Sequence, residues 1–190
     1  MTNSEQLTAL CLENGAYKAA VIPVEEIPFR PELRAACEAN ACGAYGKNWM
    51  CPPLVGEIGA LIERAKSYRY ALVFQTVGQL EDSFDFEGMT AAGAAHNEVE
   101  ARITVQVEPL LRPQGWLVLS AGGCPVCSEC AAVQNEPCRF PERARASLEA
   151  YGIAVSELAA LCGMKYINGA NTVTYFGAYL FGQGAPNGEK

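Results

Sequence analysis

The sequence has little positive charge and almost no histidine, and both shortages restrict what the protein can do. Its 190 residues carry 14 Lys and Arg against 21 Asp and Glu, a formal net charge of −7. Nucleic acids and anionic membrane surfaces bind clusters of basic residues, so we expect neither as the main partner. His96 is the single histidine. A lone histidine on a helix is more typical of an exposed or hydrogen-bonded side chain than of a metal ligand.

Several familiar sequence signals are also missing. No apolar run approaches the length of a bilayer span. The N-terminal stretch MTNSEQLTALCLENG has no basic segment followed by an apolar one, so we do not expect a signal peptide. There is no glycine-rich dinucleotide fingerprint, no P-loop and no C-x3-C-x2-C spacing of the kind associated with radical chemistry. These absences favour a cytoplasmic protein without a membrane span.

Alternating strand and helix patterns predict an α/β fold, built as a single domain over residues 1–190. Strands are predicted over 17–24, 70–77, 116–120 and 172–181, and helices over 31–39, from 57 onward, 89–111, 141–152 and 156–162. Because a long helix joins the second and third strands, we expect a right-handed parallel crossover. The expected architecture is a small central sheet of about four strands with flanking helices and cysteine-rich loops at its rim.

Nine cysteines are many for a chain of this length. A disulfide framework is disfavoured, because the number is odd and nothing suggests a small secreted domain. Burial as small hydrophobic residues suits Cys11 and Cys162, which stand alone in apolar patterns. The other seven fall into two local clusters, which favours metal binding: Cys37, Cys42, Cys51, Cys124, Cys127, Cys130 and Cys138.

The segment AGGCPVCSECAAVQNEPCRFP gives the strongest signal in the chain. Cys124, Cys127 and Cys130 occur in C-x2-C-x2-C order, and Cys138 follows a proline. Bacterial ferredoxins hold 4Fe–4S clusters with such a run, although their fourth cysteine is closer. Structural zinc is the alternative, since four thiolates also make a good zinc site. Plain packing of the thiols is a third interpretation.

The segment ACGAYGKNWMCPPLVG overlaps the other cluster, over residues 37–53, in which Cys37, Cys42 and Cys51 are spaced C-x4-C-x8-C-P-P. Three local cysteines leave the fourth ligand of a cubane cluster unassigned. An iron without a protein ligand would be a Lewis acid able to bind substrate. Lys47 and Tyr45 lie inside this loop and are weak candidates for catalytic residues, while solvation and packing are their alternative roles.

The motifs CGAYGKNWMCPP, GGCPVCSECAAVQNEPCRFPERARASLEAYGI and TVTYFGAYLF together resemble a family of predicted metal-binding proteins of bacteria and archaea, many of them anaerobes. The resemblance covers roughly residues 37–181. It implies a metal site at the seven clustered cysteines and no particular reaction, because the family has no established activity.

Three functions are compatible with these patterns. The first is a cytoplasmic iron–sulfur protein, with one or two 4Fe–4S clusters, that transfers electrons to a redox protein in anaerobic metabolism. The second is an enzyme whose cluster at Cys37, Cys42 and Cys51 binds substrate through an open iron. The third is a non-catalytic protein that binds zinc or handles metals. We favour the first, because the chain has no dinucleotide fingerprint, P-loop or radical-type cysteine spacing. Two clusters a short distance apart and an acidic surface that steers toward a basic partner would both suit it.

Overall fold

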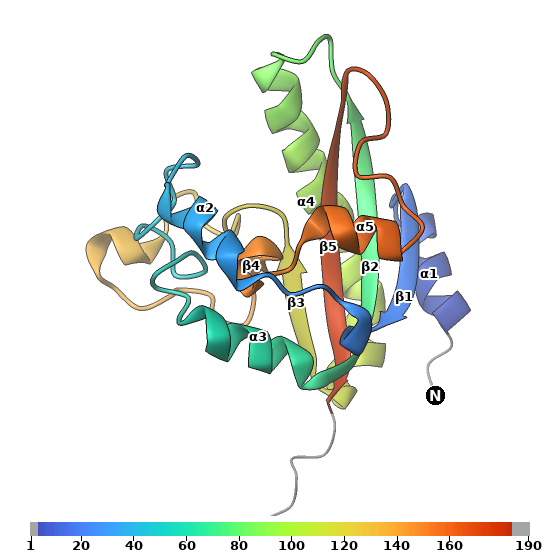
Figure 1. Cartoon of the computed structure of the whole chain (residues 1–190), viewed down its shortest axis with the longest axis horizontal. Coiled ribbons are helices and arrows are strands. Elements are labelled where there is room, and N and C mark those ends of the chain that lie inside the picture. The colour runs from blue at the N-terminus through green and yellow to red at the C-terminus, as the bar shows by residue number, and fades with distance from the viewer. Residues whose placement is uncertain (1–3, 184–190) are drawn as a thin grey trace, which may run out of the picture.

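The computed structural model describes residues 4–183 and forms a five-stranded sheet within them. The strands are β1 (Lys18–Pro23), β2 (Tyr68–Gln79), β3 (Trp116–Ser120), β4 (Ala146–Ser147) and β5 (Thr172–Gln183), in the order β1-β2-β5-β3-β4 (Figure 1). Neighbouring strands are antiparallel except β3 and β4, which are parallel. The α/β class is confirmed, with five strands in place of about four.

Helices cover both faces of the sheet. They are α1 (Ser4–Glu13), α2 (Arg34–Glu38), α3 (Ile58–Lys66), α4 (Phe86–Leu111) and α5 (Val155–Leu161). Short 3-10 turns connect them at η1 (Val24–Glu26), η2 (Pro31–Leu33), η3 (Arg112–Gln114), η4 (Ala131–Gln134) and η5 (Glu149–Tyr151). Figure 1 shows α5 in front of the sheet and α4 behind it.

The alternation of side chains along β2 divides the core between the two faces. Leu72 and Phe74 point to one face and pack with residues of α1 and α4. Ala71 and Val73 point to the other face and pack with residues of α3 and α5. All four side chains are fully buried. A strand buried on both faces reads as a continuous apolar run, which is why YALVFQTV was recognisable in the sequence.

The last strand of the chain is inserted at the centre of the sheet. β5 pairs with β2 on one side and with β3 on the other, antiparallel to both. The strands β2 and β3 therefore run in the same direction, as the crossover prediction requires, but they are not neighbours. Gly177 of β5 faces the Phe74 ring, and a Cβ at this position would lie 2.5 Å from two ring atoms. The ring fills the space that a side chain would need.

The long helix α4 begins three residues earlier than predicted. The side chain of Asp85 accepts a hydrogen bond from the backbone N–H of Gly88 at 2.7 Å, which caps the first turn. The spacing of Val99, Ile103, Val107 and Leu110 predicts the apolar face of this helix. The first three are buried against the sheet, and Leu110 is partly buried beside them.

The predicted helix over 141–152 is wrong. This segment contains a turn, the two residues of β4 and the 3-10 turn η5. Its charged, alanine-rich sequence favours a helix by local propensity, but the backbone pairs instead with the open edge of β3. The N–H of Leu148 donates to the carbonyl of Ser120 at 3.1 Å, and Leu148 itself is buried. Tertiary pairing therefore overrides local propensity here.

Candidate metal centre

The first cysteine segment is a series of turns between α2 and α3. Cys37 lies in α2, whereas Cys42 and Cys51 lie in the loop that follows. Asn40 adopts a positive φ of 54°, and its side chain accepts a hydrogen bond from the N–H of Tyr45 at 3.0 Å. These contacts hold the loop in a defined shape without regular secondary structure.

The second cysteine segment, residues 121–141, begins at the end of β3, and the chain returns to the sheet at β4. Cys124, Cys127 and Cys130 lie in irregular loop structure, and the 3-10 turn η4 separates them from Cys138. Two buried alanines of η4, Ala131 and Ala132, anchor the excursion to the rest of the protein. Both segments are loop-rich, as expected for cysteine-bearing excursions at the rim of the sheet.

The two segments lie side by side beyond the β3–β4 edge, at the left in Figure 1. The side-chain amide of Asn48 donates to the carbonyl of Cys124 at 3.4 Å. The backbone N–H of Trp49 donates to the Cys130 sulfur at 3.5 Å, and the indole N–H of Trp49 donates to the carbonyl of Glu136 at 2.9 Å. A Cβ built on Gly123 would lie 3.8 Å from the sulfur of Cys51. Residues 76 to 87 positions apart in sequence thus share one site.

Four cysteines of the second segment line a common cavity of about 20 Å³, roughly the space of one water molecule. Its walls also include Trp49, Met50, Val126 and Phe140 from the two segments, and its cysteines are Cys124, Cys127, Cys130 and Cys138. Four thiols around one apolar hollow are a suitable donor set for iron–sulfur clusters and for zinc.

The thiols are not arranged tightly around one point. Within residues 4–183, no three Cys, His, Asp or Glu side chains already form a metal-binding group. The seven clustered cysteines are half-buried, apart from Cys42, which is exposed.

The electrostatic environment of the first segment favours a bound cation. Burial raises the pKa of the Cys51 thiol to about 11, with smaller contributions from the charged forms of the nearby sulfurs of Cys42, Cys37, Cys124 and Cys130. A metal ion supplies the positive charge that several adjacent thiolates need. Because sulfurs of both segments are close enough to affect its pKa, Cys51 lies where the two segments meet.

The other residues singled out in the sequence lie in different settings. Lys47 is exposed and Tyr45 is half-buried in the loop, and their catalytic roles stay predictions. Cys11 and Cys162 pack in the cores on opposite faces of the sheet, and burial raises the pKa of each to about 12. His96 is buried, with its Nδ1 2.8 Å from the hydroxyl of Thr76.

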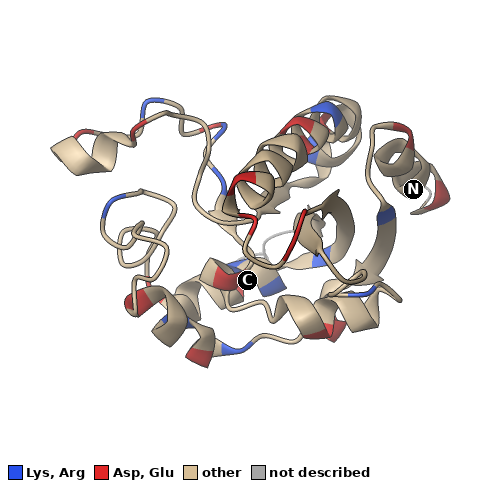
Figure 2. Ribbon diagram, turned by 90° about the horizontal axis from the view of Figure 1, so that it is seen from above, with Lys and Arg blue, Asp and Glu red and all other residues tan. Residues whose placement is uncertain are grey.

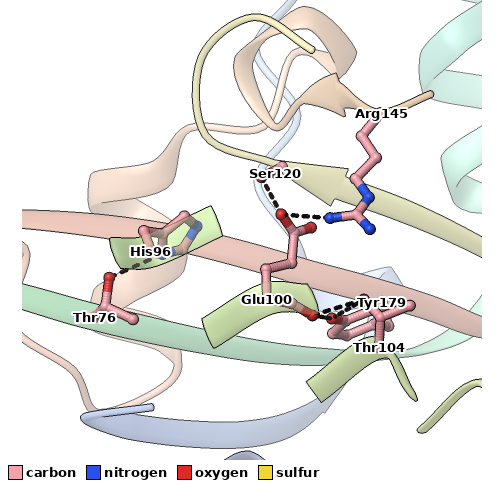
Figure 3. Close-up of polar contacts among 7 residues, drawn as sticks. All are labelled: Thr76, His96, Glu100, Thr104, Ser120, Arg145 and Tyr179. Carbon is pink, nitrogen blue, oxygen red and sulfur yellow. Dashed lines mark hydrogen bonds and ion pairs between the residues drawn. The ribbon is translucent and has the colours of Figure 1, made fainter. Parts of the chain in front are cut away.

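A buried polar network that no sequence pattern predicted lies next to the second cysteine segment. The fully buried carboxylate of Glu100 on α4 accepts a hydrogen bond from Ser120 at 2.7 Å and pairs with Arg145 at 2.9 Å (Figure 3). Ser120 immediately precedes the cysteine excursion and Arg145 follows it, so Glu100 ties both of its ends to α4. Glu100 lies four residues after His96 and three before Ile103, so it is on the same helix face as the buried apolar residues. A carboxylate on this apolar face was the sequence feature that could have predicted the network.

Comparison with protein families places the chain in a family of predicted metal-binding proteins. Residues 20–181 match the model of the family described as predicted metal-binding protein, DUF2284. The chain belongs to this family. The matched region contains all seven clustered cysteines and the whole sheet apart from the first residues of β1 and the last of β5. No curated protein and no solved structure matches the chain.

The DUF2284 assignment agrees with the metal-binding interpretation and does not name the metal. None of the helices within residues 4–183 has the length and apolar character needed to cross a membrane. All nine cysteines are free thiols.

Proposed function

We propose that this member of the DUF2284 family is an iron–sulfur protein that transfers electrons to a redox protein in the cytoplasm of an anaerobe. The observation that supports this most is the convergence of Cys124, Cys127, Cys130 and Cys138 on one cavity. Their C-x2-C-x2-C run is a ligand pattern of 4Fe–4S clusters. Free thiols throughout the chain suit a reducing compartment.

A bound cluster would supply one-electron chemistry, and the surrounding residues would set its potential. The backbone N–H of Trp49 donates to the Cys130 sulfur, and hydrogen bonds of this kind stabilise the reduced form of a cluster. Met50, Val126 and Phe140 form apolar walls that limit the access of water to the site. The thiolates of the four cysteines are the ligands in this proposal.

The partner in this proposal is a protein with a basic surface. The net charge of −7 would steer association with such a partner. Figure 2 shows acidic positions distributed over several elements, with basic positions among them. Electron transfer should then slow as ionic strength rises, because salt screens the attraction between exposed charges.

Zinc binding is the second candidate function. The cavity of about 20 Å³ suits a single ion, and four thiolates form a structural zinc site. The two functions differ in composition: an iron–sulfur protein contains iron and acid-labile sulfide in near-equal amounts, whereas a zinc protein contains neither. Protein produced without oxygen in iron-replete medium should be brown and contain both. Stoichiometric zinc in a colourless protein without sulfide would refute the iron–sulfur proposal.

We further propose that the two segments hold two centres. The double variant Cys42→Ser/Cys51→Ser should lose the iron of one centre and keep the electron paramagnetic resonance signal of the other. The variant Cys127→Ser/Cys138→Ser should give the opposite result. A Cys162→Ala variant is the control, since this thiol packs in the core outside the site. If either double variant keeps all its iron, or loses both signals while folded, the seven cysteines do not form two independent centres.

A further inference from the structure

A second cavity adjoins the cysteine site and has a very different lining. It is a cleft of about 500 Å³ between α4, the start of β3 and the loop that follows Cys138, and we call it the arginine cleft. Four of the 14 basic residues of this acidic chain line it, against two glutamates: Arg64, Arg112, Arg143 and Arg145, with Glu108 and Glu142. Figure 2 shows several basic positions along the loop after the cysteine segment.

Two of these arginines are already neutralised by neighbouring carboxylates. Arg112 pairs with Glu108 and Glu142, and Arg145 pairs with the buried Glu100. These ion pairs fix two guanidinium groups in the wall of the cleft. Arg112 and Arg145 should attract an added anion only weakly, because each already pairs with at least one carboxylate.

The other two arginines have no carboxylate partner within residues 4–183. Arg64 donates a hydrogen bond to the hydroxyl of Tyr151 at 3.3 Å, and the guanidinium of Arg143 lies 5.6 Å from the centre of the Phe140 ring. Neither contact compensates the positive charge. A planar guanidinium with unused N–H groups binds carboxylate and phosphate oxygens through paired hydrogen bonds. The cleft therefore has two positive charges available for an anion.

Apart from Thr104, the rest of the lining is apolar and partly aromatic. Trp116 and Val118 of β3 line the cleft, together with Val105 of α4, which is 67% exposed. Volumes of roughly 300–1,000 Å³ are usual for small-molecule sites that combine an apolar wall with a few polar groups. The lining is thus suited to an anionic group attached to a flat or apolar body.

We propose that the arginine cleft binds a small organic anion, with its carboxylate or phosphate group held between Arg64 and Arg143 and its body against Trp116. The site is close to the cysteines, because Ala144 lines both the arginine cleft and the cavity of the four thiols. Anion binding itself does not require a metal. The inference therefore goes beyond the proposed function and can fail independently of it.

Isothermal titration calorimetry of the metal-loaded protein tests the proposal with phenyl phosphate and phenylacetate, and with phenylacetamide as the neutral analogue. We expect saturable binding of at least one anion and no measurable binding of the amide. Stronger binding of phenyl phosphate would assign a phosphate ligand, and stronger binding of phenylacetate a carboxylate ligand. Equal binding of the amide would overturn the proposal, because the guanidinium groups would then contribute nothing.

Matched double variants separate the cleft from the general charge of the protein. Arg64→Gln/Arg143→Gln should weaken anion binding at least tenfold. Lys66→Gln/Arg69→Gln removes the same charge from a different cleft, lined in part by β2, and should change affinity less than twofold. The residues of both pairs are exposed, so we expect both variants to fold, which circular dichroism would check. Equal loss in the two variants would refute the site.

Iron and sulfide measured in the same samples separate this inference from the proposed function. The Arg64→Gln/Arg143→Gln variant should retain the metal content of the parent protein. Unchanged anion affinity in that variant would refute the arginine cleft as the binding site and leave the iron–sulfur proposal intact. A colourless parent protein without iron and sulfide that still binds phenyl phosphate would refute the iron–sulfur proposal and leave the arginine cleft intact.

Discussion

Replacing Arg145 by methionine should strongly destabilise the protein, and by an amount that depends on pH. In the folded protein, one oxygen of the Glu100 carboxylate accepts from both Arg145 and Ser120. The other oxygen, Oε1, is buried without a hydrogen-bond partner among the described residues. Methionine approximates the length of the arginine stem and removes its charge. The buried carboxylate would then keep a single neutral donor.

The expected loss at neutral pH is about 3–5 kcal/mol, the usual cost of removing one partner from a buried ion pair. Glu100 is completely buried and the Arg145 side chain is only 16% exposed, so solvent would do little to stabilise the remaining charge. A domain of this kind has a total stability of about 5–15 kcal/mol. The substitution therefore removes a large share of it.

The pH dependence follows from the pKa of Glu100. Burial raises this pKa above its usual value, and Arg145 and Ser120 partly oppose the shift. A carboxyl with a raised pKa binds its proton more tightly in the folded state, so stability falls as pH rises through the folded pKa. Removing Arg145 raises the pKa further and widens this pH range. The stability lost by the Arg145→Met variant should therefore be smallest at the acidic end of a pH series and should grow as pH rises.

Urea unfolding followed by circular dichroism would measure both proteins at pH 5, 6, 7 and 8, with metal content determined in each sample. Arg143→Met is the matched control, because this exposed arginine lies two residues away and has no carboxylate partner among residues 4–183. It should cost less than about 0.5 kcal/mol. A loss for Arg145→Met that is independent of pH, or no larger than the control, would refute the role assigned to the Glu100 charge.

Three further predictions concern other parts of the molecule. Burial, and then the charge of Arg145, lower the pKa of His96 to about 4. The unfolded state therefore takes up this proton at higher pH than the folded state, and the free energy of unfolding should fall by about 3 kcal/mol between pH 6.5 and 4. In urea unfolding measured over this pH range, His96→Gln should show a smaller fall in stability. Gly177→Ala should lower the free energy of unfolding by about 1–3 kcal/mol in thermal unfolding, because its Cβ would overlap the Phe74 ring. The control Gly59→Ala, whose Cβ would meet nothing within 4 Å, should be neutral or stabilising. Chelation should increase protease cleavage within 121–141, because metal binding would hold this loop-rich segment; equal cleavage rates with and without metal would contradict that role.

Local patterns predicted the elements that are defined by their own residues. The apolar run of β2 and the periodic face of α4 could be predicted from the sequence, because each is buried along its own length. The two cysteine clusters could be predicted as well, since a set of ligands at short spacing depends only on the chain between its members. Cysteine spacing could not show that Asn48 and Trp49 of one segment would contact the other, because those contacts span about 80 residues of intervening fold.

The segment 141–152 illustrates the limit of local reasoning. Its residues favour a helix when considered alone, and the strand β4 forms only because β3 has an open edge beside it. The central position of β5 was likewise undetermined, since β-strand pairing partners are set by packing across the sheet and not by the strand itself.

The sequence by itself determined the α/β class, the acidic surface and the thiol-rich character of the site. Only the tertiary structure decided which side chains share a site. Glu100 looks like one of many glutamates until α4 is packed on the sheet, where burial leaves its charge dependent on Arg145. Arg64 and Arg143 are 79 positions apart and become a pair only because the loop after Cys138 returns along β3. Charge and donor chemistry are local properties of residues, whereas burial and proximity exist only after the chain has folded.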